Sequence, residues 1–144
     1  MTVHIVKLCV GVDSVDDLEH WIEHRQHLLA LAGEPQEHIH TTRMTPKRRE
    51  ELLDGGSLYW VIKGMILARQ PIIDLRQIVS EDGISRCQIV MEPTLIRTES
   101  QPKRAFQGWR YLKDNEAPKD IDLLRQDDDL PTDFRRELAE LGLL

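Results

Sequence analysis

The sequence contains little cysteine, few aromatic residues and no long hydrophobic run. Its 144 residues include two cysteines, Cys9 and Cys87, which lie in apolar surroundings without CxxC spacing. We therefore expect reduced, buried thiols and a core that needs neither a disulfide nor a structural metal. No segment approaches the roughly 20 consecutive apolar residues that span a bilayer, which excludes a membrane-spanning helix.

The N-terminal stretch also lacks targeting features. MTVHIVKLCVGVDSVDD has no basic start and reaches acidic residues by Asp13, unlike a signal peptide. We therefore expect a cytoplasmic, soluble protein with no membrane partner. The length predicts one domain over residues 1–144, which can bury roughly two-thirds of its unfolded surface.

Common catalytic and phosphate-binding motifs are missing as well. The chain has no GxxxxGK[ST] or GxGxxG loop, and Gly56-Ser57 is followed by Leu58-Tyr59 rather than by a GxSxG elbow. The acidic run at 127–129 lacks the glycine and distal glutamate of a calcium loop. We predict no catalytic residue and no cofactor from sequence, and whether the protein is an enzyme stays open.

The histidines resemble metal ligands but fit another interpretation better. His20, His24 and His27 follow i, i+4 and i+7 spacing on one helix face, and His38 and His40 share one strand face. Imidazoles at such spacing can ligate zinc. The helical set lies opposite the apolar stripe of its helix and does not form HExxH, so we predict a solvated face and no metal site.

Charge is divided along the chain although the net charge is −6. Residues 1–40 carry 2 basic and 7 acidic side chains, residues 41–113 carry 13 and 8, and residues 114–144 carry 4 and 10. A basic middle is thus flanked by two acidic segments. Five of the seven aromatic residues lie in that middle: Tyr59, Trp60, Phe106, Trp109 and Tyr111.

The longest apolar stretch, Leu52–Leu75, predicts a central β-hairpin. Asp54-Gly55-Gly56-Ser57 has the composition of a turn, and the strand that follows to Ile62 shows no polar alternation, so both of its faces should be covered. Lys63-Gly64 predicts a tight connection to a partner strand. Pro71 cannot donate to a ladder, so we expect the partner strand to be interrupted there.

Shorter periodic segments predict the other elements. Ser14 is a suitable N-cap for a helix, and Thr45 followed by Pro46 predicts the start of a short one. Thr132 or Asp133 predicts the start of a last helix. The expected strands cover residues 3–10, 38–44, 84–91 and 94–98, and the expected helices cover residues 14–32, 47–53 and a C-terminal segment ending at Leu141.

These elements predict an α+β fold. The strands do not alternate regularly with helices, which argues against a doubly wound sheet. We expect a mixed, mostly antiparallel sheet that curls into a pseudo-barrel. The helix at residues 14–32 and the C-terminal helix should flank this sheet.

The basic middle also supplies the candidate site. Phosphates attract cations, and unstacked bases stack on aromatic or guanidinium planes, so a single-stranded nucleic-acid site needs both. We predict a non-catalytic RNA- or nucleotide-binding module that uses a surface from residues 43–113. Its contacts would come from Arg43, Lys47, Arg48, Lys103, Arg104, Trp109, Arg110 and Tyr111.

Other interpretations remain open at this point. The aromatic residues could be core, and the arginines could pair with acidic residues of the flanks, which would leave no basic surface. An enzyme acting on a small nucleotide or nucleic-acid substrate would need a polar pair such as a histidine and a carboxylate. A protein-interaction domain could instead associate through an exposed hairpin edge. Oligomeric state is not predicted.

Three motifs carry a resemblance to a known family. They are Thr45-Pro46-Lys47-Arg48, the stretch GGSLYWVIKG at 55–64, and FQGWRYL at 106–112. Together they resemble a bacterial family known as domain of unknown function 1489, over nearly the whole chain. The resemblance implies no activity.

A looser similarity concerns the order of elements. A short helix, a glycine-rich turn, an apolar strand and a returning strand are similar to PUA-like domains, including the ASCH and EVE types. That similarity implies a pseudo-barrel that binds RNA or modified bases in a cleft edged by aromatic and basic residues.

Overall fold

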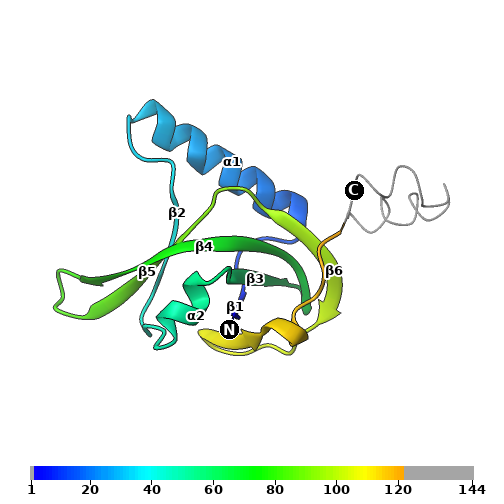
Figure 1. Ribbon diagram of the computed structural model, residues 1–144. Coiled ribbons are helices and arrows are strands. Elements are labelled where there is room, and N and C mark those ends of the chain that lie inside the picture. The colour runs from blue at the N-terminus through cyan, green and yellow to red at the C-terminus, as the bar shows by residue number, and fades with distance from the viewer. Residues whose placement is uncertain (1, 122–144) are drawn as a thin grey trace.

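The structure is a computed structural model that describes residues 2–121 (Figure 1). The C-terminal helix that we expected, with Thr132, Asp133 and Leu141, lies outside the described residues. The strands are β1 (Val3–Leu8), β2 (His38–Thr42), β3 (Ser57–Ile62), β4 (Met65–Val79), β5 (Ser85–Met91), β6 (Ile96–Pro102) and β7 (Trp109–Lys113). The helices are α1 (Val15–Leu31), α2 (Arg49–Leu53) and the short 3-10 helix η1 (Asp114–Glu116).

The strands form one mixed sheet in the order β2-β5-β4-β3-β1-β7. The β1 and β3 strands are parallel, and the other pairs are antiparallel. Strand β6 pairs with the first part of β4 and β5 with its second part, so the two succeed each other along β4. The predicted α+β class and the mostly antiparallel sheet are confirmed.

The predicted closure of the sheet into a pseudo-barrel is not confirmed. Strands β2 and β7 end the sheet, and within residues 2–121 they do not pair with each other. In the described part of the chain after β7, backbone pairing with the sheet is limited to an isolated bridge between Thr98 of β6 and Asp120. The described sheet is therefore curved but open.

The central hairpin matches its prediction. All six residues of β3 are buried between β1 and β4. The connection at Lys63 and Gly64 has φ angles of 49° and 80°, so both residues of this tight turn adopt a left-handed conformation. Pro71 does not interrupt β4, contrary to our expectation, because the break falls between β5 and β6, where the Glu92 N–H donates to the Pro71 carbonyl at 2.9 Å.

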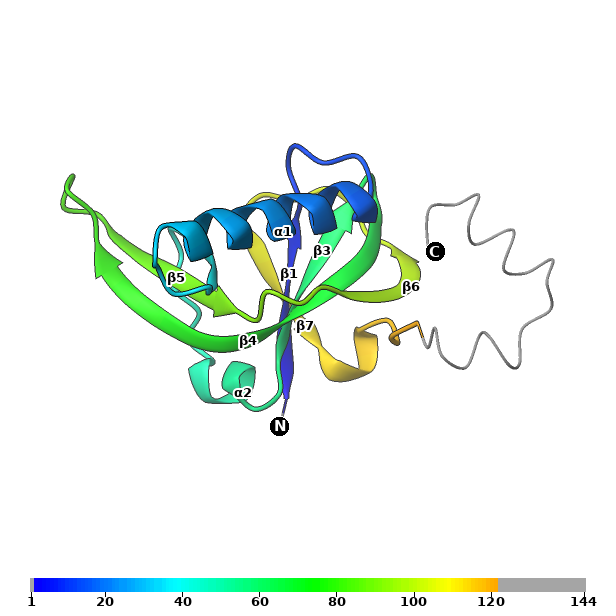
Figure 2. The ribbon, with the colours of Figure 1, turned by 90° about the horizontal axis from the view of Figure 1, so that it is seen from above.

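Helix α1 covers one face of the sheet, as Figures 1 and 2 show. Ser14 is its N-cap, and the Ser14 hydroxyl accepts from the Asp17 N–H at 3.1 Å. Within residues 15–31, burial is limited to the first half of the helix, at Val15, Leu18 and Ile22. The second half is therefore less buried, with Gln26 and Leu29 only partly covered. No helix among residues 2–121 is long and apolar enough to cross a membrane.

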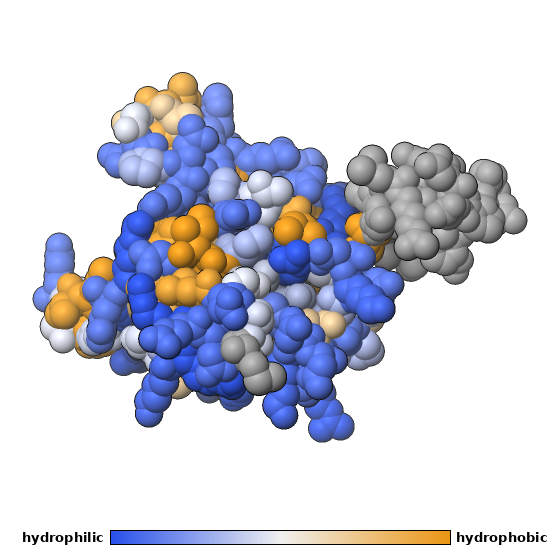
Figure 3. Space-filling model, viewed as in Figure 1, coloured by the Kyte–Doolittle hydropathy of each residue, from blue (hydrophilic) through white to orange (hydrophobic). Residues whose placement is uncertain are grey.

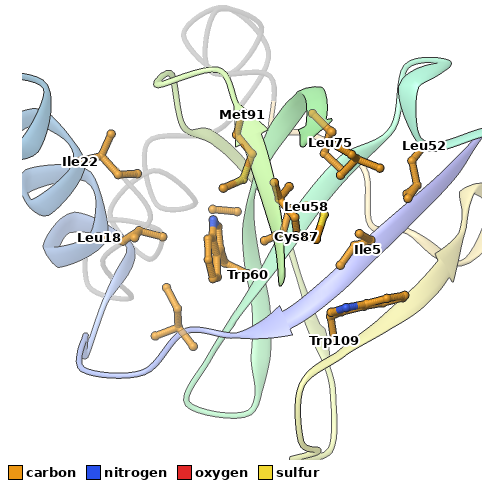
Figure 4. Packing of buried hydrophobic residues seen from close by; sticks show 14 of the residues in the cluster. Ile5, Leu18, Ile22, Leu52, Leu58, Trp60, Leu75, Cys87, Met91 and Trp109 are labelled. Atoms are coloured by element: carbon orange, nitrogen blue, oxygen red, sulfur yellow. The ribbon is translucent and has the colours of Figure 1, made fainter. Parts of the chain in front are cut away.

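Alternation along the strands divides the core between the two faces of the sheet. On the α1 side, Ile5 and Trp60 pack with Leu18 and Ile22 (Figure 4). On the other side, Val6, Tyr59 and Leu112 form a smaller cluster. Trp60 faces α1 in Figure 4, whereas Trp109 lies at the far end of the same cluster.

The helix predicted over residues 47–53 is shorter in the structure. Helix α2 begins at Arg49, and Thr45 does not cap it. The Lys47 and Arg48 N–H groups donate to the Tyr111 hydroxyl at 2.8 and 3.2 Å. These contacts with β7 keep Lys47 and Arg48 out of the helix. Helix propensity, which depends on neighbouring residues, does not reveal such a contact.

Candidate ligand-binding pocket

The eight residues predicted to bind nucleic acid do not share one surface. Successive residues of β7 point to opposite faces of the sheet, so Trp109 and Tyr111 contact the α1-side core while Leu112 contacts the other side. Arg110 lies over the ring of Phe106, which packs on that second side. The predicted aromatic and basic residues are therefore split between two regions.

Trp109 is a core residue. Its side chain is 4% exposed, and its indole N–H donates to the Met44 carbonyl at 2.9 Å. Its ring meets Tyr111 edge to face, with centroids 4.8 Å apart. In this arrangement Trp109 offers no free face on which a base could stack, and it positions the loop after β2 instead.

The backbone N–H groups just before α2 also already have partners. The two backbone N–H groups that could have held a phosphate, those of Lys47 and Arg48, already donate to Tyr111. The guanidinium of Arg48 lies 5.4 Å from the Tyr111 ring centroid and pairs with Glu51. That pairing holds the pKa of the Glu51 carboxyl below its usual range.

Several predicted cations are already engaged. Arg110 donates to the Gln107 carbonyl at 2.8 Å, and the Lys103 ammonium lies 5.9 Å from the Phe106 centroid. Of the predicted cations, Arg43, Lys47 and Arg104 have side chains with no ion pair, hydrogen bond or cation–π contact to another residue of 2–121. These three remain accessible to an anionic partner.

The acidic flanks neutralise part of the basic middle. Arg69 forms two hydrogen bonds with Asp120, both of 2.7 Å, and Arg76 binds both oxygens of Glu37. Arg97 pairs with Asp16 on α1. Part of the opposite charge of the middle and the flanks is thus neutralised by ion pairs within the chain.

A pocket of about 590 Å³ opens beside the middle of α1. It is lined by residues 7–12 and 38–41 together with Leu18, Trp21, Arg25 and Trp60. We call it the α1 pocket. Pockets of roughly 300–1,000 Å³ hold drug-sized ligands. On the face shown in Figure 3, hydrophobic atoms gather below the C-terminal end of α1, over β2, β4 and β5.

The charge of the α1 pocket is opposite to that of its surroundings. Lys7 and Arg25 are the two basic residues among residues 1–40, and both line the pocket. None of the described residues that line it carries a carboxylate, and neither cation forms an ion pair with the described part of the chain. The pocket therefore favours an anionic ligand.

Aromatic side chains form two of its walls. Trp21 is 48% exposed, and the Arg25 guanidinium lies 5.4 Å from its ring centroid. Trp60 is 4% exposed, and its indole N–H donates to the Gln70 amide oxygen at 2.8 Å. Trp21 is thus half-exposed with the Arg25 guanidinium over its ring, while Trp60 is fixed in place.

Two histidines of β2 stand edge-on to these rings. The His38 and Trp21 centroids are 5.7 Å apart, and those of His40 and Trp60 are 5.6 Å apart. Burial lowers the pKa of His38 to about 4, with further contributions from Arg25 and His40. Burial and then Lys7 lower the pKa of His40 to about 4 as well. Both imidazoles are therefore neutral at pH 7.

The other reactive side chain of the pocket is Cys9. Burial raises the pKa of its thiol to about 11, although Lys7 acts in the opposite direction. A protonated thiol is a poor nucleophile. Among residues 2–121, no group of three histidine, cysteine or acidic side chains is placed to hold a metal ion.

A second pocket, of about 340 Å³, lies on the other face of the sheet near η1. It contains the kind of histidine–carboxylate pair that an enzyme would need, since His4 Nε2 lies 2.8 Å from Asp114. The Ser57 N–H donates to His4 Nδ1 at 3.0 Å, so Nε2 carries the proton and no lone pair is free to accept one from a substrate. This pair holds η1 to the sheet.

Sequence reasoning missed most of the α1 pocket. It noted that His38 and His40 share a strand face but did not connect them with Lys7, Trp21 or Arg25. The available signals were the isolation of two cations in an acidic segment and the i, i+4 spacing of Trp21 and Arg25. Neither signal shows that residues 7–12, α1 and residues 38–41 lie together. The three exposed histidines of α1, His20, His24 and His27, lie on a solvated face as predicted.

The fold and the pocket describe an α+β protein with a cationic, aromatic-walled cavity beside one helix. The chain belongs to the family described as protein of unknown function (DUF1489), whose model matches residues 5–144. This confirms the resemblance carried by the three motifs. No curated protein and no solved structure matches the chain, and the similarity to PUA-like domains is not confirmed.

Proposed function

We propose that this protein is a non-catalytic binding module for a nucleotide, which it holds in the α1 pocket. The observation that carries the proposal is the pair of cations, Lys7 and Arg25, in a pocket whose described lining has no carboxylate. The protein as a whole has a net charge of −6, so such a cavity stands out against its surroundings. An anionic group would gain most from binding there.

The geometry favours a nucleotide over a simple anion. Trp21 presents a half-exposed ring with the Arg25 guanidinium over it, and bases stack both on aromatic rings and on guanidinium planes. Apolar side chains such as Leu8 and Leu18 line the remaining wall. A bare inorganic anion would leave this apolar surface without a partner.

The surface predicted from sequence becomes a second candidate for a longer RNA. Of its eight residues, Arg43, Lys47 and Arg104 keep free cationic groups for phosphate contacts. Trp109 and Tyr111 would then contribute by holding the loop that carries Lys47, through their contacts with Met44 and the Lys47 N–H. The experiment below separates this surface from the pocket.

A tryptophan fluorescence titration with adenosine 5′-monophosphate and uridine 5′-monophosphate tests the proposal. We expect saturable binding that weakens as salt increases, because ion pairs with phosphate are screened. Lys7→Ala/Arg25→Ala should weaken binding by about tenfold or more, as charge-assisted hydrogen bonds are lost. The matched control, Arg43→Ala/Lys47→Ala/Arg104→Ala, should bind the mononucleotide like the wild type.

Two results would count against the proposal. Absence of binding at low salt, with protein that folds normally, would remove the nucleotide function. Loss of binding in the control triple variant, with the pocket variant unaffected, would move the site to the surface. Binding of single-stranded RNA that is lost in the control triple variant and kept in the pocket variant would likewise place the site on the surface.

A further inference from the structure

Buried polar atoms without a hydrogen-bond partner are concentrated beside the α1 pocket. In the described part of the chain, four side-chain atoms have this property: Gln26 Nε2 and Oε1, His38 Nδ1, and His40 Nε2. Gln26 belongs to α1 and follows Arg25, while both histidines belong to β2 and line the pocket. Native structures pair nearly all such atoms, so a cluster of exceptions requires an explanation.

The neighbouring contacts do not provide one. His38 is 2% exposed, and its close aromatic neighbour, Trp21, meets it edge to face without a hydrogen bond. His40 stands in the same relation to Trp60, whose indole N–H is already committed to Gln70. The neighbouring residues thus leave one nitrogen of each imidazole, Nδ1 of His38 and Nε2 of His40, without a hydrogen-bond partner, which a ligand could supply.

We infer that His38 and His40 recognise the polar edge of the base of the bound nucleotide. A neutral imidazole offers one N–H donor and one lone-pair acceptor, so two of them can match a ring that carries both kinds of group. A nucleobase has such an edge, whereas a sugar phosphate has no planar one. This inference rests on the proposed nucleotide function and adds the feature of the ligand that is recognised.

The two kinds of side chain have separate roles, although Arg25 acts on His38 and Lys7 on His40 from nearby. Lys7 and Arg25 interact with the phosphate, which every nucleotide shares, and they contribute affinity. His38 and His40 interact with the base and contribute selectivity, since a site built to hydrogen-bond a group strongly rejects an analogue that lacks it. Gln26, whose amide also has a donor and an acceptor, lies on the helix that forms the opposite wall.

The test compares adenosine 5′-monophosphate with ribose 5-phosphate, which keeps the phosphate and lacks the base. The wild type should bind the nucleotide at least about tenfold more tightly. His38→Phe and His40→Phe keep a flat ring but remove the hydrogen bonds, and each should lower this ratio by about three- to tenfold without changing the affinity for ribose 5-phosphate. His20→Phe and His24→Phe, on the exposed face of α1, should leave the ratio unchanged.

A measurement on the wild type covers the case in which a phenylalanine variant does not fold. The imidazole ¹⁵N resonances of His38 and His40 should shift on addition of adenosine 5′-monophosphate and stay in place with ribose 5-phosphate. Equal affinity for the two ligands, or identical resonances with both, would overturn base recognition and leave the phosphate-binding function standing. Binding of neither ligand would overturn the proposed function itself.

Discussion

Gln70 links a wall of the α1 pocket to the centre of the sheet. It is fully buried, accepts from the Trp60 indole N–H at 2.8 Å and donates to the Glu92 carbonyl at 2.9 Å. Glu92 lies between β5 and β6, where their pairing with β4 is interrupted. One amide side chain thus fixes the Trp60 ring and satisfies a carbonyl at the break.

Replacing Gln70 tests this link. In Gln70→Leu the buried Trp60 N–H loses its acceptor and the part-buried Glu92 carbonyl loses a donor, so we expect the free energy of unfolding to fall by about 1–3 kcal/mol. Urea denaturation measures the change. Gln77→Leu is the matched control, because Gln77 is exposed and bonds only Ser85, and it should change stability by less than about 0.5 kcal/mol. Equal effects of the two substitutions would contradict the role of Gln70.

The two neutral histidines predict how stability depends on pH. His38 and His40 have folded-state pKa values of about 4, below the ordinary value of 6.5, so between those values the unfolded chain binds more protons. Their stabilising contribution is therefore complete above about pH 6.5 and is lost as pH falls towards 4. Protonation would also place positive charge near Arg25 and Lys7.

We expect the unfolding free energy to decrease by about 2–4 kcal/mol between pH 7 and pH 4.5 on account of this pair. Chemical denaturation at a series of pH values measures it. His38→Phe/His40→Phe should flatten the profile over this range, whereas His20→Ala/His24→Ala should not. An unchanged slope in the phenylalanine variant would show that these imidazoles do not resist protonation.

At the scale of elements, β7 acts as the support for the loop between β2 and α2. Trp109 donates to the Met44 carbonyl, and Tyr111 accepts from the Lys47 N–H, so two side chains of one strand face hold both ends of the loop. The aromatic residues that looked most suited to stacking on bases are used for this support. The basic residues of this loop, such as Lys47, are therefore placed by the loop and do not form one surface with the aromatic rings of β7.

The approach of α2 to β1 depends on Gly56. A Cβ atom at this position would overlap the carbonyl oxygens of Leu52 and Val3, both of which belong to the backbone and cannot move aside. We expect Gly56→Ala to lower the unfolding free energy by more than about 2 kcal/mol.

Gly83 provides the comparison for that substitution. Its φ of 80° is unfavourable for alanine, but a Cβ there meets nothing within 4 Å. Gly83→Ala should therefore cost only about 1 kcal/mol. Thermal or urea unfolding of both variants measures the change in unfolding free energy. A smaller decrease for Gly56→Ala than for Gly83→Ala would contradict the close packing at Gly56.

At the scale of the whole molecule, the acidic flanks and the basic middle are parts of one charge-paired body. Arg69, Arg76 and Arg97 bind acidic partners from outside the middle segment. Among the described residues, the basic side chains without an ion pair include the pocket pair Lys7 and Arg25 and, on the surface predicted from sequence, Arg43, Lys47 and Arg104. Linear charge division therefore predicts which segments attract each other better than it predicts a binding surface.

Much of the fold follows from local patterns in the sequence. The unbroken burial of β3 and the capping of α1 by Ser14 depend on neighbouring residues, and both were predicted. The interaction of Tyr111 with Lys47 joins residues 64 positions apart, so the late start of α2 could not be predicted. The same holds for the α1 pocket, because its lining joins residues 7–12, α1, residues 38–41 and Trp60. Which of these segments lie together is a tertiary property.

The most direct test of the account maps the binding of adenosine 5′-monophosphate by ¹H–¹⁵N chemical-shift perturbation on the full chain. We predict that the shifted resonances cluster at residues 7–12 and 38–41, together with the indole N–H of Trp21. Shifts confined to the neighbourhood of Arg43, Lys47 and Arg104, or no shifts at millimolar nucleotide, would contradict the assignment of the α1 pocket as the binding site.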